Sequence, residues 1–202
     1  MEELKKSPFF EKAALVTDSN SATPLHLACA SSKIRLTQET LGCFGTAEAA
    51  VVRDKKSRTP MHVAAENPKM TKQFIKALAD INPKAAKVRN SKGRMPLHVA
   101  LRKNAKDTVI KALLKVNPKA VKTTFNSRNC IFHEMCEYKN SAAVMKTMLR
   151  MYPEGAKVKN KSGNLPLHDA IAFECSIDVV QELLDAYPDG STSKNKNGDT
   201  PL

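Results

Sequence analysis

The sequence repeats itself at intervals of 35 or 36 residues. Four segments share a proline, an apolar residue and a histidine in a row: TPLHLACA from Thr23, TPMHVAAE from Thr59, MPLHVALR from Met95 and LPLHDAIA from Leu165. The gap between the last two leaves room for one more copy, which would begin at Cys130, and a further TPL begins at Thr200. A single unit of this length cannot bury its apolar face alone, so the fixed period predicts neighbouring units that stack on one another.

Each unit carries the signals of two helices. Thr is a good N-cap and Pro suits the first helical position, so a first helix is expected to follow each Thr-Pro. A second helix is indicated by apolar residues at i, i+1, i+4 and i+5, for example Val109, Ile110, Leu113 and Leu114. A proline then ends each second helix. These prolines lie 35 residues apart, at Pro83, Pro118, Pro153 and Pro188.

Turn residues mark the junction between one unit and the next. Asn90, Asn160 and Asn195 are each followed by glycine three residues later, and Asp54 holds the same position in an earlier unit. Such pairs of Asx and Gly predict a tight turn. The Thr-Pro-Leu-His motif, its helix and this turn together resemble the ankyrin repeat family, and the resemblance covers nearly the whole chain. It implies an all-α fold, in which stacked helix-turn-helix units form a solenoid and are joined by β-hairpin-like fingers.

The resemblance also implies how the chain is divided. A single ankyrin repeat domain is expected over residues 1–202. Residues 1–22 would form an N-terminal cap, with Phe9 and Phe10 packed under the first repeat. The repeats would be 23–58, 59–94, 95–129, 130–164 and 165–199, and residues 200–202 would start a truncated repeat. An end three residues into a repeat suggests that this sequence is a fragment of a longer protein.

The stretch CIFHEMCEY, residues 130–138, has the residue types of a metal or thiol site. Cys130 and His133 could share a helical face, but Cys136 is rotated off it, and a structural zinc needs four ligands. The histidine also falls on the repeat position that holds all five histidines of the chain, which are His26, His62, His98, His133 and His168. The resemblance implies that these histidines form hydrogen bonds near the helix start. We therefore expect structural histidines, no catalytic, cofactor-binding or metal-binding residue, and no enzyme activity.

The other reactive side chains fit the repeat as well. Cys136 falls at a small apolar position of a first helix and Cys43 in the apolar stripe of a second helix, where buried thiols act as small hydrophobes. Cys175 alone falls in a loop between helices and is the candidate for oxidation. Glu134 and Asp169 follow the repeat histidine, and we expect them to be neighbours at a partly exposed position.

Basic residues outnumber acidic ones by 33 to 20, which gives a formal net charge of +13. Much of this charge recurs at fixed positions of the fingers and at the ends of first helices. The resemblance implies that this surface contacts partners. The candidate partner-binding residues are Arg53, Lys55, Lys56, Arg58, Arg89, Lys92, Arg94, Arg102, Lys103, Lys139, Lys159, Lys161, Lys194 and Lys196.

Two functions remain open, besides a charged face that is merely solvated. The first is a protein–protein interaction scaffold, whose concave surface of fingers and first helices favours an acidic partner. The second is a basic platform for a polyanion, either nucleic acid or anionic lipid, and the low aromatic content of 5% weighs against base stacking. Either could be the recognition part of a larger multidomain protein. The sequence lacks a signal peptide and an apolar run of membrane-spanning length, so we expect a monomer in the cytoplasm or nucleus.

The fourth repeat is predicted to open first. Cys130 replaces the capping Thr of the first two repeats, and Ile131 replaces the first-turn Pro that all the other repeats have. The lost cap alone costs about 1 kcal/mol. Native-state hydrogen exchange should therefore show the helix that follows Cys130 exchanging before the other first helices. Slowest exchange in this helix would contradict the prediction.

Overall fold

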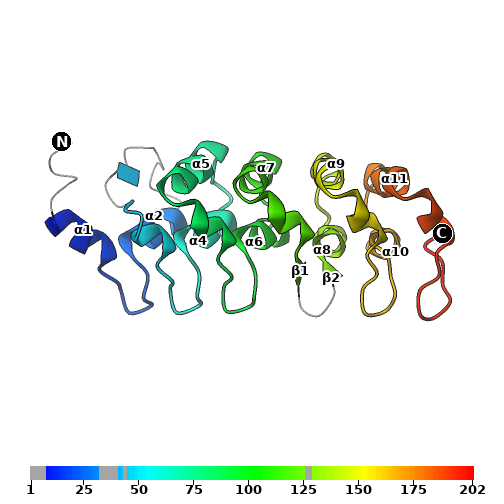
Figure 1. The fold of residues 1–202 in the computed structure, drawn as a ribbon, viewed down its shortest axis with the longest axis horizontal. Helices are drawn as coiled ribbons and strands as arrows, with labels where there is room; N and C mark the ends of the chain where they lie inside the picture. The colour runs from blue at the N-terminus through cyan, green and yellow to red at the C-terminus, as the bar shows by residue number, and fades with distance from the viewer. Residues whose placement is uncertain (1–7, 32–40, 43–44, 126–128) are drawn as a thin grey trace. The chain divides into compact units, whose positions relative to one another are not determined.

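The computed structural model describes residues 8–31, 41–42, 45–125 and 129–202 (Figure 1). Over these residues the chain forms ten α-helices, a series of short 3₁₀ turns and one two-stranded antiparallel sheet. The predicted all-α class is confirmed. Packing gathers the chain into two compact units: an N-terminal unit of residues 1–100 with 108–117, and a C-terminal unit of residues 101–107 with 118–202.

The first helix of each repeat begins where the sequence predicts and is seven residues long. These helices are α2 (Pro24–Ala30), α4 (Pro60–Glu66), α6 (Pro96–Arg102), α8 (Ile131–Glu137) and α10 (Pro166–Ala172). Ala28, Ala64 and Ala100 hold the same position in three of them and are buried. Because these side chains are small, neighbouring helices approach closely, and α2 packs on α4. α8, which has Met135 at this position, packs on α10.

The second helices are ten residues long and supply the larger apolar side chains. They are α5 (Lys72–Ile81), α7 (Asp107–Val116), α9 (Ala142–Met151) and α11 (Ile177–Ala186). The predicted stripe of α7 is buried at all four positions, whereas in α11 Leu183 is buried and Leu184 half-buried. The second helix of the first repeat falls mostly outside the described residues, as does the predicted position of Cys43.

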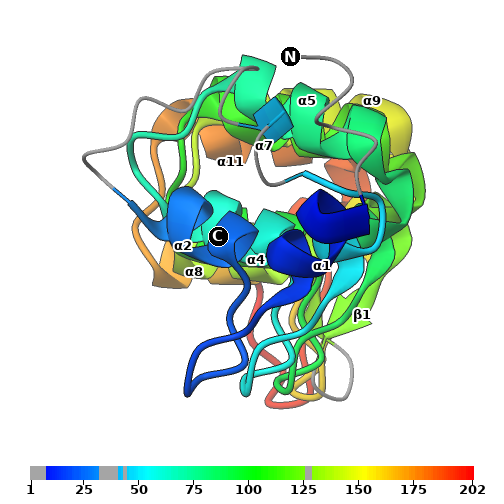
Figure 2. The same cartoon turned by 90° about the vertical axis from the view of Figure 1, so that its left-hand side faces the viewer.

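A 3₁₀ turn follows each second helix and starts at the predicted proline. These turns are η3 (Pro83–Lys87), η4 (Pro118–Lys122), η5 (Pro153–Lys157) and η6 (Pro188–Thr192), and the shorter η2 (Ala49–Val51) lies in the first repeat. Proline suits this place because the first residue of a helical turn needs no amide donor. Within each unit, the first and second helices form two layers, and the fingers project beyond the layer of first helices (Figures 1 and 2).

One finger differs from the others in its backbone. Strands β1 (Thr124–Phe125) and β2 (Asn129–Cys130) pair there, with Thr124 opposite Cys130 and Phe125 opposite Asn129. At the other end of the chain, α1 (Pro8–Leu15) contacts α2. The side chains of Phe9 and Phe10 lie outside the described part of α1, so their packing under the first repeat stays a prediction.

The fourth repeat has an unusually large side chain in its first helix. Phe132 is fully buried at the position that Leu97 and Leu167 hold in neighbouring repeats. Its ring lies against Gly155 of η5, where a Cβ atom would collide with the ring carbons. The glycine therefore makes room for the phenylalanine. In the second and third repeats, no phenylalanine holds the position of Phe132, and alanine holds the position of Gly155.

Gly155→Ala should therefore destabilise the protein by about 1–3 kcal/mol, which is the usual cost of overpacking a core. Urea unfolding measures the change. Gly190→Ala is the matched control one repeat later, since the nearest atom to its Cβ would be Tyr187 Cδ1 at 3.1 Å, and it should cost less. Adding Phe132→Leu to Gly155→Ala should restore part of the loss. Equal costs for the two glycines would contradict this account.

Candidate functional site: the basic fingers

The fingers are built around an Asp or Asn side chain. They comprise residues 18–22, 53–58, 89–94, 159–164 and 194–199, apart from the β1–β2 finger. In the second of them, Asp54 Oδ1 accepts hydrogen bonds from the backbone amides of Lys56 and Arg58, at 2.9 and 2.8 Å. The Asp54 amide donates to the Arg58 carbonyl at 2.9 Å. Asn90, Asn160 and Asn195 make the same set of bonds in their fingers.

The predicted glycines meet a backbone requirement of these turns. Gly93 has a φ of 73° and Gly163 a φ of 78°, in the left-handed region that glycine enters without strain. Ser57 takes the same conformation in its finger with a φ of 55°. The Asx bonds are therefore strong enough to hold the turn even where the residue is not glycine.

Successive fingers are joined by backbone hydrogen bonds. In the N-terminal unit, the Lys55 amide donates to the Asn20 carbonyl at 2.9 Å and the Ser91 amide to the Lys56 carbonyl at 3.0 Å. In the C-terminal unit, the Lys196 amide donates to the Ser162 carbonyl at 3.0 Å. Within each unit the fingers are thus held at fixed spacing, and so are the Cα atoms that carry the basic side chains.

The basic side chains of the N-terminal fingers fall into two groups. Those of Arg53, Lys55, Lys56, Arg89 and Lys92 are exposed. Arg58 and Arg94 are half-buried. The Arg58 guanidinium forms ion pairs with Asp54 at 2.7 Å and with Glu66 at 2.9 Å. Arg58 therefore braces its own finger, and the surface available to a partner consists of the exposed group.

Charges of both signs border a hollow at the first two fingers. A cavity of about 240 Å³ lies between the first two fingers and the helices α2 and α4. Asp18 and Asp54 contribute to its lining beside Lys55, Lys56 and Arg58. The carboxylate of Asp54 is buried and held by Arg58 and by backbone amides, and these hydrogen bonds and the Arg58 charge lower its pKa despite burial. The exposed charge of the second finger is therefore positive.

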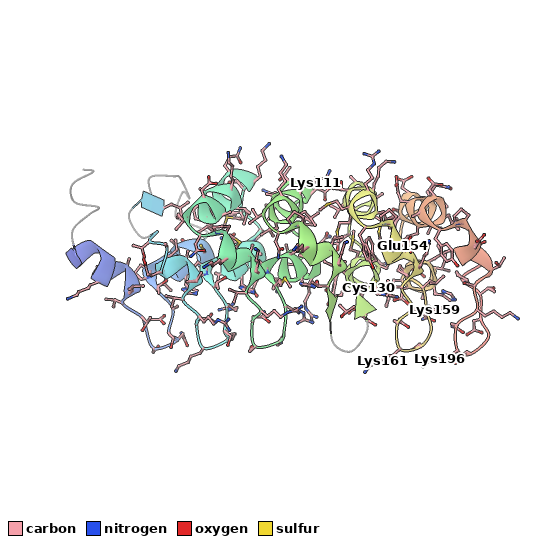
Figure 3. All side chains as sticks on the ribbon, in the orientation of Figure 1. Lys111, Cys130, Glu154, Lys159, Lys161 and Lys196 are labelled. Atoms are coloured by element: carbon pink, nitrogen blue, oxygen red, sulfur yellow. The ribbon has the colours of Figure 1, made fainter. Side chains whose placement is uncertain are left out.

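The C-terminal unit has its own basic fingers. Lys159, Lys161, Lys194 and Lys196 are exposed, and three of them are labelled on the fingers in Figure 3. Lys159 Nζ donates to the Lys194 carbonyl at 2.9 Å, which links these two fingers. At the ends of first helices, Lys103 and Lys139 are exposed. Arg102, also exposed, lies over the Tyr138 ring at 5.1 Å and donates to its hydroxyl at 2.6 Å.

The repeat histidines hold the base of the fingers. His62 Nδ1 accepts from the backbone amide of Thr59 at 3.1 Å, and His62 Nε2 donates to the carbonyl of Arg94, 32 residues later, at 2.9 Å. His26 bonds in the same way to Thr23 and Arg58. Because one nitrogen accepts and the other donates, each ring must be neutral, with its proton on Nε2. The histidine thereby ties the start of one helix to the finger of the next repeat.

Known protein families bear out this architecture. The family model described as "Ankyrin repeats (3 copies)" matches residues 25–126, just over half of the chain.

The chain belongs to the ankyrin repeat family.

Solved structures agree with this assignment. The ankyrin repeat domain of Bcl-3, described as a unique member of the IkappaB protein family, is similar to the chain with a TM-score of 0.74 and 21% sequence identity. The similarity covers 98% of this chain and 85% of that one, and it extends the ankyrin-repeat solenoid fold beyond the residues that the family model matches. In all, 320 solved chains match significantly. No curated protein sequence does.

Three ankyrin repeats lack the Thr that precedes the helix, and in two of them the repeat histidine accepts from the backbone alone. The amide of Met95 donates to His98 Nδ1 at 3.3 Å, and that of Leu165 donates to His168 Nδ1 at 3.1 Å. His168 Nε2 still reaches the next finger, at the Asp199 carbonyl, over 3.2 Å. The Thr hydroxyl is thus an additional contact of the histidine in the repeats that have it. The hydrogen bond from the backbone amide to the histidine is common to all the repeats.

The CIFHEMCEY stretch forms α8 and keeps the histidine's bonds. His133 accepts from the Cys130 amide at 3.2 Å and donates to the Asn164 carbonyl at 3.0 Å. The Cys130 thiol lies 3.0 Å from His133 Nδ1, where the first two repeats place the Thr hydroxyl. The thiol partly replaces the lost cap, whereas the first-turn proline is replaced by a buried Ile131. Within the described ranges, no group of three or more His, Cys, Asp or Glu side chains is placed to hold a metal ion.

The expectation of partly exposed carboxylates at Glu134 and Asp169 was wrong. Glu134 is only 3% exposed and Asp169 only 7%. Burial raises the pKa of the Asp169 carboxyl, although nearby His133 and a hydrogen bond from Asn164 Nδ2 at 3.2 Å oppose the rise. The position after the histidine faces the packed interior here, because the first helices α8 and α10 lie directly against each other.

Sequence analysis missed a set of bonds in the loops that follow first helices. Asn67 Nδ2 donates to the Cys29 carbonyl at 2.9 Å, and Asn140 Nδ2 donates to the Leu101 carbonyl at 3.1 Å. Each joins a loop to the end of the preceding repeat's first helix. The recurrence of Asn in these loops was the available signal.

Over the part of the chain that the structure describes, no helix is both long and apolar enough to cross a membrane.

Protein stability should fall as the pH drops from about 6.5 to about 4. Burial lowers the pKa of His62 and of His98 to about 4, from 6.5 in the unfolded chain. Between pH 6.5 and 4, these histidines bind protons in the unfolded state but not in the folded state. Their contribution to the free energy of unfolding is therefore complete above pH 6.5. It is lost on acidification by roughly 1 kcal/mol per pH unit for each ring. Denaturant unfolding at several pH values measures this. His62→Gln should flatten the profile, and a wild-type profile that is already flat would contradict it.

Proposed function

We propose that this ankyrin repeat chain is a protein-interaction module that binds an acidic segment of a partner protein across its basic fingers. In the N-terminal unit the contact residues would be Arg53, Lys55, Lys56, Arg89 and Lys92. The exposed lysines of the C-terminal fingers offer the same chemistry in their own unit. Ankyrin repeats are interaction modules, and the net charge of +13 favours approach of an acidic partner.

The observation that carries the proposal is the rigid spacing of exposed cations. The backbone bonds from Lys55 to Asn20 and from Ser91 to Lys56 hold three successive fingers together. Arg58 neutralises the carboxylate that belongs to its own finger, so that Asp54 does not cancel the lysines beside it. Little backbone ordering is then needed on binding, which favours affinity.

Nucleic acid fits these fingers less well than an acidic peptide. Sequence-tolerant binding of single strands uses aromatic platforms, and residues 53–58 and 89–94 include no aromatic residue. The tyrosines lie in the C-terminal unit. Tyr138 lies under Arg102, Tyr152 lies near Phe132 with ring centroids 6.5 Å apart, and Tyr187 lies under Lys157.

Charge reversal on the fingers tests the proposal. Lys55→Glu, Lys56→Glu and Lys92→Glu should together weaken binding of a fluorescent glutamate-rich peptide at least about tenfold, because attraction becomes repulsion at three contacts. Fluorescence anisotropy measures the affinity. The same variant should lose the protein partners that the wild type recovers from cell extract.

The matched control reverses three lysines of α5 and η3. Lys72→Glu, Lys76→Glu and Lys84→Glu change the net charge by the same amount in the same unit, away from the fingers, and should leave binding nearly unchanged. Equal loss in both variants would show that only net charge matters. If duplex DNA bound more tightly than the peptide, with a steep dependence on salt, the partner would be a polyanion and not an acidic protein.

A further inference from the structure

Two cysteines that are 39 residues apart meet between the fourth and fifth repeats. Cys136 lies in α8 and is fully buried, and Cys175 lies half-buried in the loop between α10 and α11. Cys175 Sγ is 3.4 Å from the backbone carbonyl oxygen of Cys136. The Cys136 thiol, whose Sγ lies 3.5 Å from the Pro166 carbonyl oxygen, is near enough to Cys175 to affect its pKa. Both residues belong to the C-terminal unit.

The repeat geometry explains why these cysteines meet. One repeat earlier, Asn140 holds the place of Cys175 and donates to the carbonyl of Leu101, which holds the place of Cys136. A loop residue of one repeat therefore always lies over this helix position of the repeat before it. Only at this junction do both positions carry sulfur, among the pairs at 101 and 140 and at 136 and 175.

The surroundings make the two thiols chemically unequal. The neighbouring Cys136 thiol and, less strongly, the Lys139 ammonium lower the pKa of Cys175 to about 7, against the opposing effects of burial and of Asp169. The interaction with Cys175 and burial raise the pKa of Cys136. Cys175 is thus partly a thiolate near neutral pH and open to solvent, which is the form that oxidants attack. Cys136 is held as the protonated thiol behind it.

We propose that Cys175 is an oxidation site for hydrogen peroxide and that Cys136 resolves it into a disulfide between the fourth and fifth repeats. The Cys175 thiolate attacks one peroxide oxygen, the O–O bond breaks, and hydroxide leaves and takes up a proton to become water. Cys136 sulfur then attacks the sulfenic acid sulfur, the S–O bond breaks, and the oxygen leaves as a second water with the Cys136 proton. Two thiols are oxidised and one peroxide is reduced.

The other described cysteines serve as internal controls. Cys29 and Cys130 are buried, and burial raises the pKa of both thiols, that of Cys130 to about 11. Neither has a thiolate to offer near neutral pH, so neither is expected to react at peroxide levels that convert Cys175. Cys130→Ser therefore removes a thiol from the same unit without touching the proposed pair.

Mass spectrometry of the whole chain under non-reducing conditions tests the proposal. After peroxide treatment at pH 7.5, the wild type and Cys130→Ser should each lose the mass of two hydrogen atoms, and tryptic mapping should recover Cys136 and Cys175 in one linked peptide. Cys175→Ser should keep its mass. Cys136→Ser should instead accumulate a Cys175 adduct with dimedone, which traps sulfenic acids.

A second measurement does not depend on any variant folding. The rate of Cys175 alkylation by iodoacetamide in the wild type should rise with pH around a midpoint near 7. A midpoint near that of an ordinary thiol, or a mapped disulfide that joins cysteines other than Cys136 and Cys175, would overturn the proposal. So would a wild type that keeps both thiols after peroxide while small-molecule thiols in the same tube are oxidised.

Discussion

The structure depends on the hydrogen bonds of one neutral histidine per repeat. Its Nδ1 accepts a hydrogen bond from the backbone amide at the start of its own helix. In four of the five repeats its Nε2 is seen to donate to a backbone carbonyl of the next finger, 31 or 32 residues later. A single buried ring therefore joins the helix start, the finger and the neighbouring repeat. The ring must be neutral for these bonds to form, because Nδ1 has to be unprotonated to accept a hydrogen bond from the backbone amide. The spacing of the fingers follows from these bonds.

The fingers show that the basic residues of one finger need not share one task. Arg58 ends its finger in ion pairs with Asp54 and Glu66, while Lys55 and Lys56 of the same finger are exposed. The difference comes from their neighbours. A half-buried guanidinium beside two carboxylates stabilises the turn, and an exposed ammonium on the same turn is left to attract other molecules. A basic finger therefore contains both residues that stabilise the turn and residues that are free to contact a partner.

Periodicity also places unlike residues in contact. In several repeats, one residue of the loop after the first helix lies on the carbonyl end of the first helix one repeat earlier, as Asn67 does on Cys29 and Asn140 on Leu101. Where both of these positions are cysteines, the packing that places an asparagine on the helix in another repeat brings two thiols together. The oxidation proposed for Cys136 and Cys175 would thus be a by-product of repeat stacking, favoured by the effect of the Cys136 thiol on the pKa of Cys175, by the nearby Lys139 and by the partial exposure of Cys175.

The sequence by itself determined the repeat length, the helix starts at Thr-Pro, the buried stripes such as that of α7, and the common role of the five histidines. These features depend on local sequence signals and on the repeat period, both of which can be recognised in a single sequence. Only the tertiary structure decided which arginines are braces, that Glu134 and Asp169 are buried, that a thiol substitutes for a hydroxyl at Cys130, and that Cys175 meets Cys136. Each of these depends on contacts between residues of different repeats or on the distance between particular atoms, and burial and electrostatics are set by those neighbours rather than by the position in the repeat.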